Sequence, residues 1–451
     1  MIKYKGSTDS FSQLLKTIGD KFLTNLCADR LDEGLSNKVK YKLIEFPYVD
    51  RDFRSVYYSD LSKRHKQISR DCVRVHLFET EFSDHDLPKA GYLGFITLRQ
   101  TPKYTIGRSY LSPRAVKHSP GYVVLSPYKV NILGQELSVN AFPWMQQDIN
   151  VTVCAHVAAW SVMRYFSSRQ PWYTDRNLAE VVSASQSPVR KIPSEGLTMG
   201  QMAHILNEIG FSTKIFPKTE VSKDLFPQIV YHYVESGIPV IANIAKEHAM
   251  VIIGHGLVKK TTGLNSPGIT DASSLIDCFL SSDDNYLPYR DLTSDSGSGY
   301  SIDQIEGILV PLHDKMYITP VDLLELLLPQ IEKQSPIKGK KLIRRVFLTS
   351  SRALKKYARE KTTDTAYKAY IYKLNLPKFV WIVEYSEPKH YDDRKADYRL
   401  IVDSTATIHD KDAILSFQQG STILDYSNKK VEEYKITDSV TPLIINNLTE
   451  I

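Results

Sequence analysis

A cysteine at the start of a strongly patterned helix is the residue best placed to do chemistry. Cys154 follows the polar segment 147–152 and begins a stretch whose apolar residues recur at helical spacing, namely Ala155, Ala158, Ala159, Val162, Met163 and Phe166. A thiol at a helix N-terminus lies at the positive end of the helix dipole, which favours the nucleophilic thiolate. Cysteine is also a frequently buried residue type, and most cysteines before helices are core residues. Catalytic partners elsewhere in the chain must therefore decide between the two interpretations.

Partners of suitable chemistry follow at the ends of predicted strands. Two consecutive buried strands are expected within 240–254, and His248 stands at the entrance of the second. A third strand leads into the adjacent carboxylates Asp283 and Asp284. Nucleophilic catalysis by cysteine needs an imidazole that moves the proton, a group that orients the imidazole and a donor for the oxyanion. The chain offers all of these, because Gln147 stands shortly before the cysteine.

This ordered set resembles the papain-like cysteine peptidases, and most closely the bacterial type that processes bacteriocin leaders, the double-glycine peptidase-like type. The resemblance covers about the middle third of the chain, in segments 147–166, 196–211, 237–256 and 279–289. It implies an α+β papain-like core, with a helix that carries the cysteine and an antiparallel sheet that carries the histidine and the aspartate. Cys154 would be the nucleophile, His248 the general base and acid, and Gln147 the oxyanion donor. Asp283 or its neighbour Asp284 would orient the histidine, and the sequence does not choose between them.

Three functions fit these residues. The first is a cysteine peptidase that cleaves a peptide or isopeptide bond of a protein substrate through a thioester. The second is a transglutaminase-like acyl transferase or deamidase that uses the same triad, with an amine as the acceptor where water is excluded. The third is a catalytically silent papain-like interaction module, which the joint presence of Gln147, Cys154, His248 and Asp283 argues against. An acetyltransferase-like interpretation of the strand before Arg99 lacks a glycine-rich pyrophosphate loop.

Other polar candidates have plainer structural interpretations. His156 lies two residues beyond Cys154 on the helix, faces away from it, and is expected to cap the helix or to lie on the surface. Cys278, in an apolar strand, and Trp160 are expected to be packing residues. The basic run 338–345 is expected to be a solvated face.

Composition predicts a soluble protein of several parts. A chain of 451 residues suits two or three domains, or one enzyme domain with additions at both ends. The net charge of +6 is small for this length and is spread along the chain, so no nucleic-acid partner is expected. No signal-peptide core and no apolar run of ~18 residues is found, so we expect no membrane association and a cytoplasmic location. The four cysteines show no paired CxxC spacing, so neither a metal nor a disulfide is expected, and the site needs no cofactor.

The expected organisation is an α+β region at 1–140, a papain-like peptidase domain at 141–312 and an α+β extension at 313–451. An apolar stripe from Phe11 to Leu26 predicts one helix with a capping box at its start, and Thr198 and Gly210 bracket another. Further strands are expected over 73–78, 92–98, 122–125, 128–134, 379–384 and 399–403, and further helices over 226–234, 320–328 and 350–359. Since the junctions at 141–144 and 308–312 are apolar, both flanking regions are expected to pack on the core.

Overall fold

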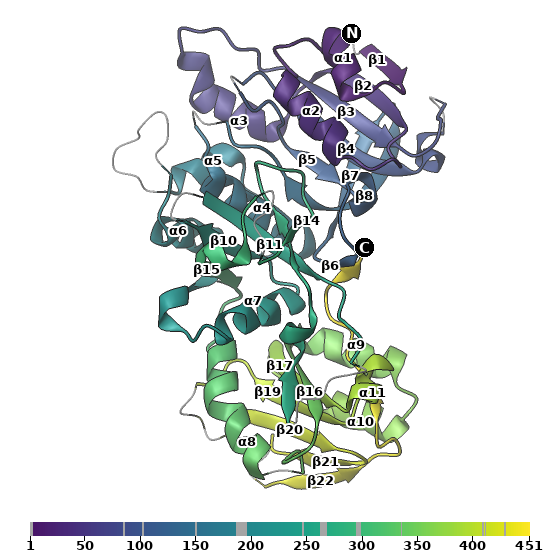
Figure 1. The fold of residues 1–451 in the computed structure, drawn as a ribbon, viewed down its shortest axis with the longest axis vertical. Helices are drawn as coiled ribbons and strands as arrows, with labels where there is room; N and C mark the ends of the chain where they lie inside the picture. The colour runs from purple at the N-terminus through teal and green to yellow at the C-terminus, as the bar shows by residue number, and fades with distance from the viewer. Residues whose placement is uncertain are drawn as a thin grey trace.

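Three β-sheets flanked by helices are stacked along the long axis of the molecule, as an N-terminal, a middle and a C-terminal body (Figure 1). The computed structural model describes residues 3–83, 86–101, 103–148, 151–185, 196–245, 248–261, 268–294, 299–334, 336–407, 410, 412–427 and 430–451. Within these residues every paired strand is antiparallel to its neighbour except one parallel pair between the middle and C-terminal bodies. The predicted α+β class is therefore confirmed.

The N-terminal body is a sheet of order β1-β2-β3-β4-β5-β8-β7 with three helices. Its elements are β1 (Lys3–Ser7), α1 (Phe11–Ile18), α2 (Asn25–Gly34), β2 (Tyr41–Tyr48), α3 (Arg51–Ser59), β3 (Cys72–Phe78), β4 (Tyr92–Leu98), β5 (Ser109–Leu111), β7 (Ser126–Ile132) and β8 (Gln135–Trp144). The predicted capping box at Ser10 and Gln13 is present. The prediction of one helix up to Leu26 is wrong, because α1 ends at Gly19, whose φ of 91° lies in the region that favours glycine.

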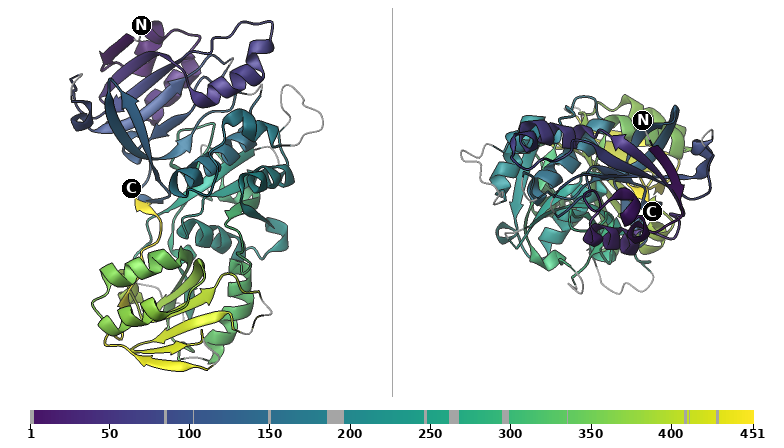
Figure 2. Two further views of the ribbon diagram at one scale, coloured as in Figure 1. Left: turned by 180° about the vertical axis from the view of Figure 1, so that it is seen from behind. Right: turned by 90° about the horizontal axis from the view of Figure 1, so that it is seen from above.

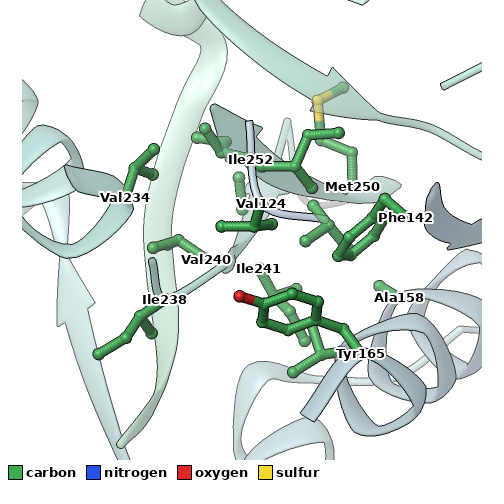
Figure 3. Packing of buried hydrophobic residues seen from close by; sticks show 14 of the residues in the cluster. Val124, Phe142, Ala158, Tyr165, Val234, Ile238, Val240, Ile241, Met250 and Ile252 are labelled. Carbon is green, nitrogen blue, oxygen red and sulfur yellow. The ribbon is translucent and has the colours of Figure 1, made fainter. Parts of the chain in front are cut away.

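The middle body is a sheet of order β14-β13-β11-β10-β15-β9, to which β6 adds beside β11. Its elements are β6 (Gly121–Val123), α4 (Cys154–Arg169), α5 (Leu178–Ser183), α6 (Met199–Ile209), β9 (Ser212–Pro217), α7 (Leu225–Glu235), β10 (Val240–Ile244), β11 (His248–Gly256), β13 (Phe279–Ser282), β14 (Arg290–Leu292) and β15 (Ile305–Leu312). Ala158 and Tyr165 of α4 pack toward Ile241 and Ile252 of the sheet (Figure 3). This core fixes the helix that begins at Cys154 against the strand that begins at His248.

The C-terminal body is a sheet of order β12-β16-β17-β19-β20-β21-β22 with helices on its faces. Its elements are β12 (Ile269–Asp271), a π-helical segment (Asp322–Leu327), α8 (Leu328–Gln334), β16 (Leu342–Ser350), α9 (Ser351–Lys361), α10 (Thr365–Lys373), β17 (Phe379–Ser386), α11 (Pro388–Asp392), β18 (Lys395–Ala396), β19 (Tyr398–Asp403), β20 (Ile414–Gln419), β21 (Thr422–Asp425), β22 (Glu432–Lys435) and β23 (Thr441–Pro442). The expected solvated face at 338–345 is partly wrong. Arg345 lies within β16, is 7% exposed and forms ion pairs with Glu235 and Glu384, since a buried guanidinium needs anionic partners.

Short strands cross between the bodies. The C-terminal strand β24 (Thr449–Glu450) returns to the middle body and pairs with β6, so the end of the chain lies beside it (Figure 2). In the opposite direction, β12 lies in sequence between the middle-body strands β11 and β13 but pairs in parallel with β16 of the C-terminal body. The boundary expected after residue 140 falls inside β8. None of the described helices is both long and apolar enough to cross a bilayer.

Candidate active site

Cys154 is the first residue of α4, and the loop before it is held by buried hydrogen bonds. Asp148 Oδ1 accepts the backbone N–H groups of Val151 at 2.7 Å and Thr152 at 3.0 Å, and the Thr152 hydroxyl accepts the Asp148 N–H at 3.0 Å. His156 Nδ1 accepts the Val153 N–H at 3.3 Å, as expected of a capping residue, although it is buried and not on the surface. The cysteine therefore stands on a loop of defined geometry.

His248 contacts the predicted nucleophile and one of the predicted carboxylates at the same time. Its Nε2 lies 3.0 Å from Asp283 Oδ1, and the Cys154 side chain is close enough to raise the pKa of the imidazole. Cys154 on α4, His248 on β11 and Asp283 just after β13 thus lie together, although 94 and then 35 positions separate them in sequence.

Asp283 is the aspartate hydrogen-bonded to the imidazole, and Asp284 makes different contacts. Asp283 Oδ1 also accepts the Asn285 N–H at 2.8 Å, whereas Asp284 Oδ1 lies 3.8 Å from His248 Nε2. Asp284 Oδ2 instead accepts the Gln147 backbone N–H at 3.4 Å. Of the two aspartates between which the sequence left the choice open, Asp283 is thus the one hydrogen-bonded to His248, while Asp284 joins the acidic pair to the loop before Cys154.

Folding shifts the pKa values of two of the site residues, His248 and Asp284. Burial lowers the pKa of His248, but the hydrogen bond to Asp283 and the nearby Cys154 side chain outweigh burial and raise this pKa to about 11. Burial and the adjacent Asp283 carboxylate raise the pKa of Asp284 to about 7. Near neutral pH the imidazole is therefore positively charged, and Asp284 is about half protonated.

Gln147 lies next to this cluster, but no hydrogen bond fixes its side chain within the described part of the chain. Gln147 as a whole is half-buried. The neighbouring Gln146 is fully engaged, since its Oε1 accepts the Cys27 thiol at 3.4 Å and the Ile106 N–H at 3.3 Å. The structure thus places Gln147 on the loop that reaches the site, without assigning its amide a partner.

Two groups at the site were not anticipated from the sequence. Tyr300 stacks on the His248 ring, with ring centroids 4.7 Å apart and an interplanar angle of 18°. The Trp144 indole N–H donates to the Asp283 backbone carbonyl at 2.7 Å, and so links the end of β8 to the acidic pair. Neither residue stands in a motif, and only spatial proximity reveals their contacts with the site.

The N-terminal body contributes directly to the position of these groups. In α2, Cys27 contacts Gln146, and the Arg30 guanidinium lies 6.0 Å from the ring centre of Tyr286, just beyond the acidic pair. In α3, the buried Asp52 carboxylate forms an ion pair with Arg164 of α4 at 3.0 Å. The helix that carries the cysteine is therefore anchored to both the N-terminal and the middle body.

The other cysteines have surroundings that disfavour reactivity. Cys27 and Cys72 are 0% exposed, against 9% for Cys154, and burial raises the pKa of Cys72. Cys278 is half-buried and precedes β13, so the expectation that it lies inside a strand is wrong; burial raises its pKa to about 11. Trp160 is fully buried, as expected of a packing residue.

Among the described residues, His248, Asp283 and Asp284 form the group best suited to hold a metal ion. One ligand atom from each of His248, Asp283 and Asp284 lies within 4.8 Å of the other two, which is a spacing that a divalent cation can bridge. A cation there would have to replace the hydrogen bond between His248 and Asp283.

A scan against protein-family models found no match, and searches of curated proteins and of solved structures found no significant similarity.

Proposed function

We propose that this protein is a papain-like cysteine hydrolase that cleaves a peptide or isopeptide bond of a protein substrate. One observation carries the proposal: a single imidazole, His248, forms a hydrogen bond with the Asp283 carboxylate and lies near enough to the Cys154 side chain that this side chain raises its pKa. This is the arrangement that activates a cysteine nucleophile, with a base beside the sulfur and a third group that orients the base. The cysteine on a helix N-terminus and the base on a neighbouring antiparallel sheet agree with a papain-like core.

Each group then has a defined task. The positively charged His248 stabilises the Cys154 thiolate, which attacks the carbonyl carbon of the substrate. His248 gives its proton to the leaving nitrogen, so that an amine departs and a thioester remains on the sulfur. Water then loses a proton to the imidazole as it attacks the thioester, the acid product leaves, and the thiolate is regenerated beside the protonated imidazole. Asp283 keeps the ring oriented through both steps.

The negative charge on the substrate oxygen needs donors near the sulfur. The first backbone N–H groups of a helix have no intrahelical acceptor, and those of α4 begin at Cys154 itself. The side-chain amide of Gln147 supplies a second donor on the neighbouring loop. Tyr300 covers one face of the imidazole, which restricts the ring's rotation and shields it from water.

Two measurements test the proposal. The first is alkylation by iodoacetamide at pH 7 followed by peptide mapping: Cys154 should react fastest, and His248→Ala should slow its reaction while leaving Cys278 unchanged. The second is incubation with a library of denatured protein substrates, in which new peptide termini should appear with the native protein and not with Cys154→Ala. Equal labelling of Cys154 and Cys278 in the native protein would contradict the assignment.

The second measurement also separates hydrolysis from acyl transfer. With a primary amine present, a hydrolase yields free acid products, whereas an acyl transferase yields amide adducts at the same carbonyl. Mass spectrometry distinguishes the two products directly.

A further inference from the structure

A cavity lies between the middle and C-terminal bodies, at the opposite end of α4 from Cys154. Its volume is about 380 Å³, which lies within the range of roughly 300–1,000 Å³ that is typical of small-molecule sites. It is lined by the last turn of α4, the turn between α7 and β10, and the junction of β16 with α9. Tyr165 and Ile238, which line one side, belong to the core of the middle body (Figure 3).

Three basic side chains line this cavity, and no acidic side chain does so among the described residues. Arg169 uses one N–H on a backbone carbonyl at 2.7 Å, and Lys378 Nζ lies 3.7 Å from the centre of the Trp172 ring. All three basic side chains are exposed, and Arg352 forms no ion pair or hydrogen bond with any described residue. Burial and the charge of Lys378 lower the pKa of His313 to about 4, so this lining residue is neutral near pH 7. The cavity therefore has an uncompensated positive charge.

The exposed Arg352 stands near the N-terminus of a helix, where an anion is favoured over a cation. It is the second residue of the 11-residue helix α9, on the side of the C-terminal body that faces the middle body (Figure 1). The positive end of the helix dipole repels a cation and attracts an anion. An anion bound between this helix end and the three basic side chains would remove the repulsion among them.

Two buried oxygen atoms in the lining provide an independent indication of a ligand. Thr349 is 2% exposed, and its Oγ1 has no hydrogen-bond partner among the described residues; the same is true of the buried Oε1 of Gln170. Buried polar atoms of folded proteins nearly always have a partner, because leaving them without one is unfavourable. A polar molecule in the cavity would supply these missing partners.

We propose that the cavity binds a phosphate monoester that carries a flat apolar group. The dianionic phosphate suits three cations better than a singly charged carboxylate does, and guanidinium groups bind phosphate oxygens in pairs. The Trp172 and Phe379 rings and the Met316 side chain, which also line the cavity, suit the flat apolar part. Such a ligand would join the C-terminal body to the helix that begins at Cys154. The proposal does not depend on the function proposed for that cysteine.

The test is calorimetric titration of the full chain at constant ionic strength with phenyl phosphate, inorganic phosphate and benzoate. Saturable binding is expected for phenyl phosphate, weaker binding for inorganic phosphate, and weaker binding still for benzoate. Arg352→Gln should weaken the binding of phenyl phosphate tenfold or more, whereas Arg359→Gln, an exposed position on the same helix, should leave it unchanged.

A second variant separates binding from folding. Thr349→Val keeps the volume of the side chain and removes a hydroxyl that has no partner in the free protein, so it should weaken phenyl phosphate binding without lowering the melting temperature of the free protein. The proposal fails if none of the three probes binds saturably, if benzoate binds as tightly as phenyl phosphate, or if Arg359→Gln weakens binding as much as Arg352→Gln.

Discussion

Asp284→Asn should stabilise this protein at alkaline pH and much less at acidic pH. Asp284 is 5% exposed, and its pKa rises from 3.8 to about 7 on folding. A carboxyl whose pKa is raised on folding contributes stability below its unfolded pKa and loses it as the pH rises through the folded pKa. The folded protein therefore becomes less stable between pH 3.8 and about pH 7 because it must keep this proton or bury a second charge beside Asp283.

The expected magnitude follows from the same values. One pH unit corresponds to about 1.4 kcal/mol, so the two units between pH 5 and the folded pKa of about 7 correspond to about 3 kcal/mol. Asparagine has nearly the volume of the protonated acid, can donate to Asp283 and can accept the Gln147 N–H. The free energy of unfolding of Asp284→Asn minus that of the native protein should thus be about 3 kcal/mol larger at pH 8 than at pH 5.

Urea unfolding followed by tryptophan fluorescence at pH 5, 6, 7 and 8 measures this difference. His248, whose pKa of about 11 is raised on folding, also loses stabilisation above its unfolded pKa of 6.5, and the comparison with the native protein removes the part of this loss that does not depend on Asp284. Asp393→Asn, an exposed aspartate for which the structure shows no side-chain partner among the described residues, is the matched control and should show no pH-dependent difference. A constant difference between Asp284→Asn and the native protein across this range would refute the reasoning.

Four further predictions concern the same site and its supports. Asp283→Asn should lower the rate of peptide cleavage roughly 100-fold, because the imidazole loses its orienting charge, as steady-state kinetics would show. Asp148→Ala removes the acceptor of two backbone N–H groups and should destabilise the protein by about 1–3 kcal/mol and slow cleavage, whereas Asp148→Asn should retain most activity; thermal unfolding and kinetics measure both. Asp52→Ala removes one of the two carboxylates that pair with the buried Arg164 guanidinium and leaves only Asp175, so it should destabilise the protein by about 1–3 kcal/mol in denaturant titrations. A chelator should leave cleavage unchanged, and added Zn²⁺ should slow it reversibly by binding His248 and the acidic pair; loss of cleavage with the chelator alone would favour a metal-dependent reaction.

Local patterns in the sequence were sufficient to predict most of the helices and strands around the site. The apolar period after Cys154 predicted α4, the run around His248 predicted β10 and β11, and Thr198 with Gly210 bracketed α6. These predictions succeeded because caps, glycines and apolar periods act within one or two turns of the chain. The same approach joined α1 and α2 into one helix, since the stripe continues in sequence while the backbone turns at Gly19.

Only the tertiary structure determines which side chains contact one another. The sequence narrowed the orienting carboxylate to Asp283 or Asp284, because both follow the same strand. The hydrogen bond at 3.0 Å to one, against 3.8 Å to the other, depends on how β13 pairs with β11. The burial of Arg345 likewise depends on Glu235 and Glu384, which lie far from it in sequence. Residue types and local spacing set the available chemistry, whereas charge pairing, stacking and pKa shifts arise from long-range packing, which brings together groups that no local pattern connects.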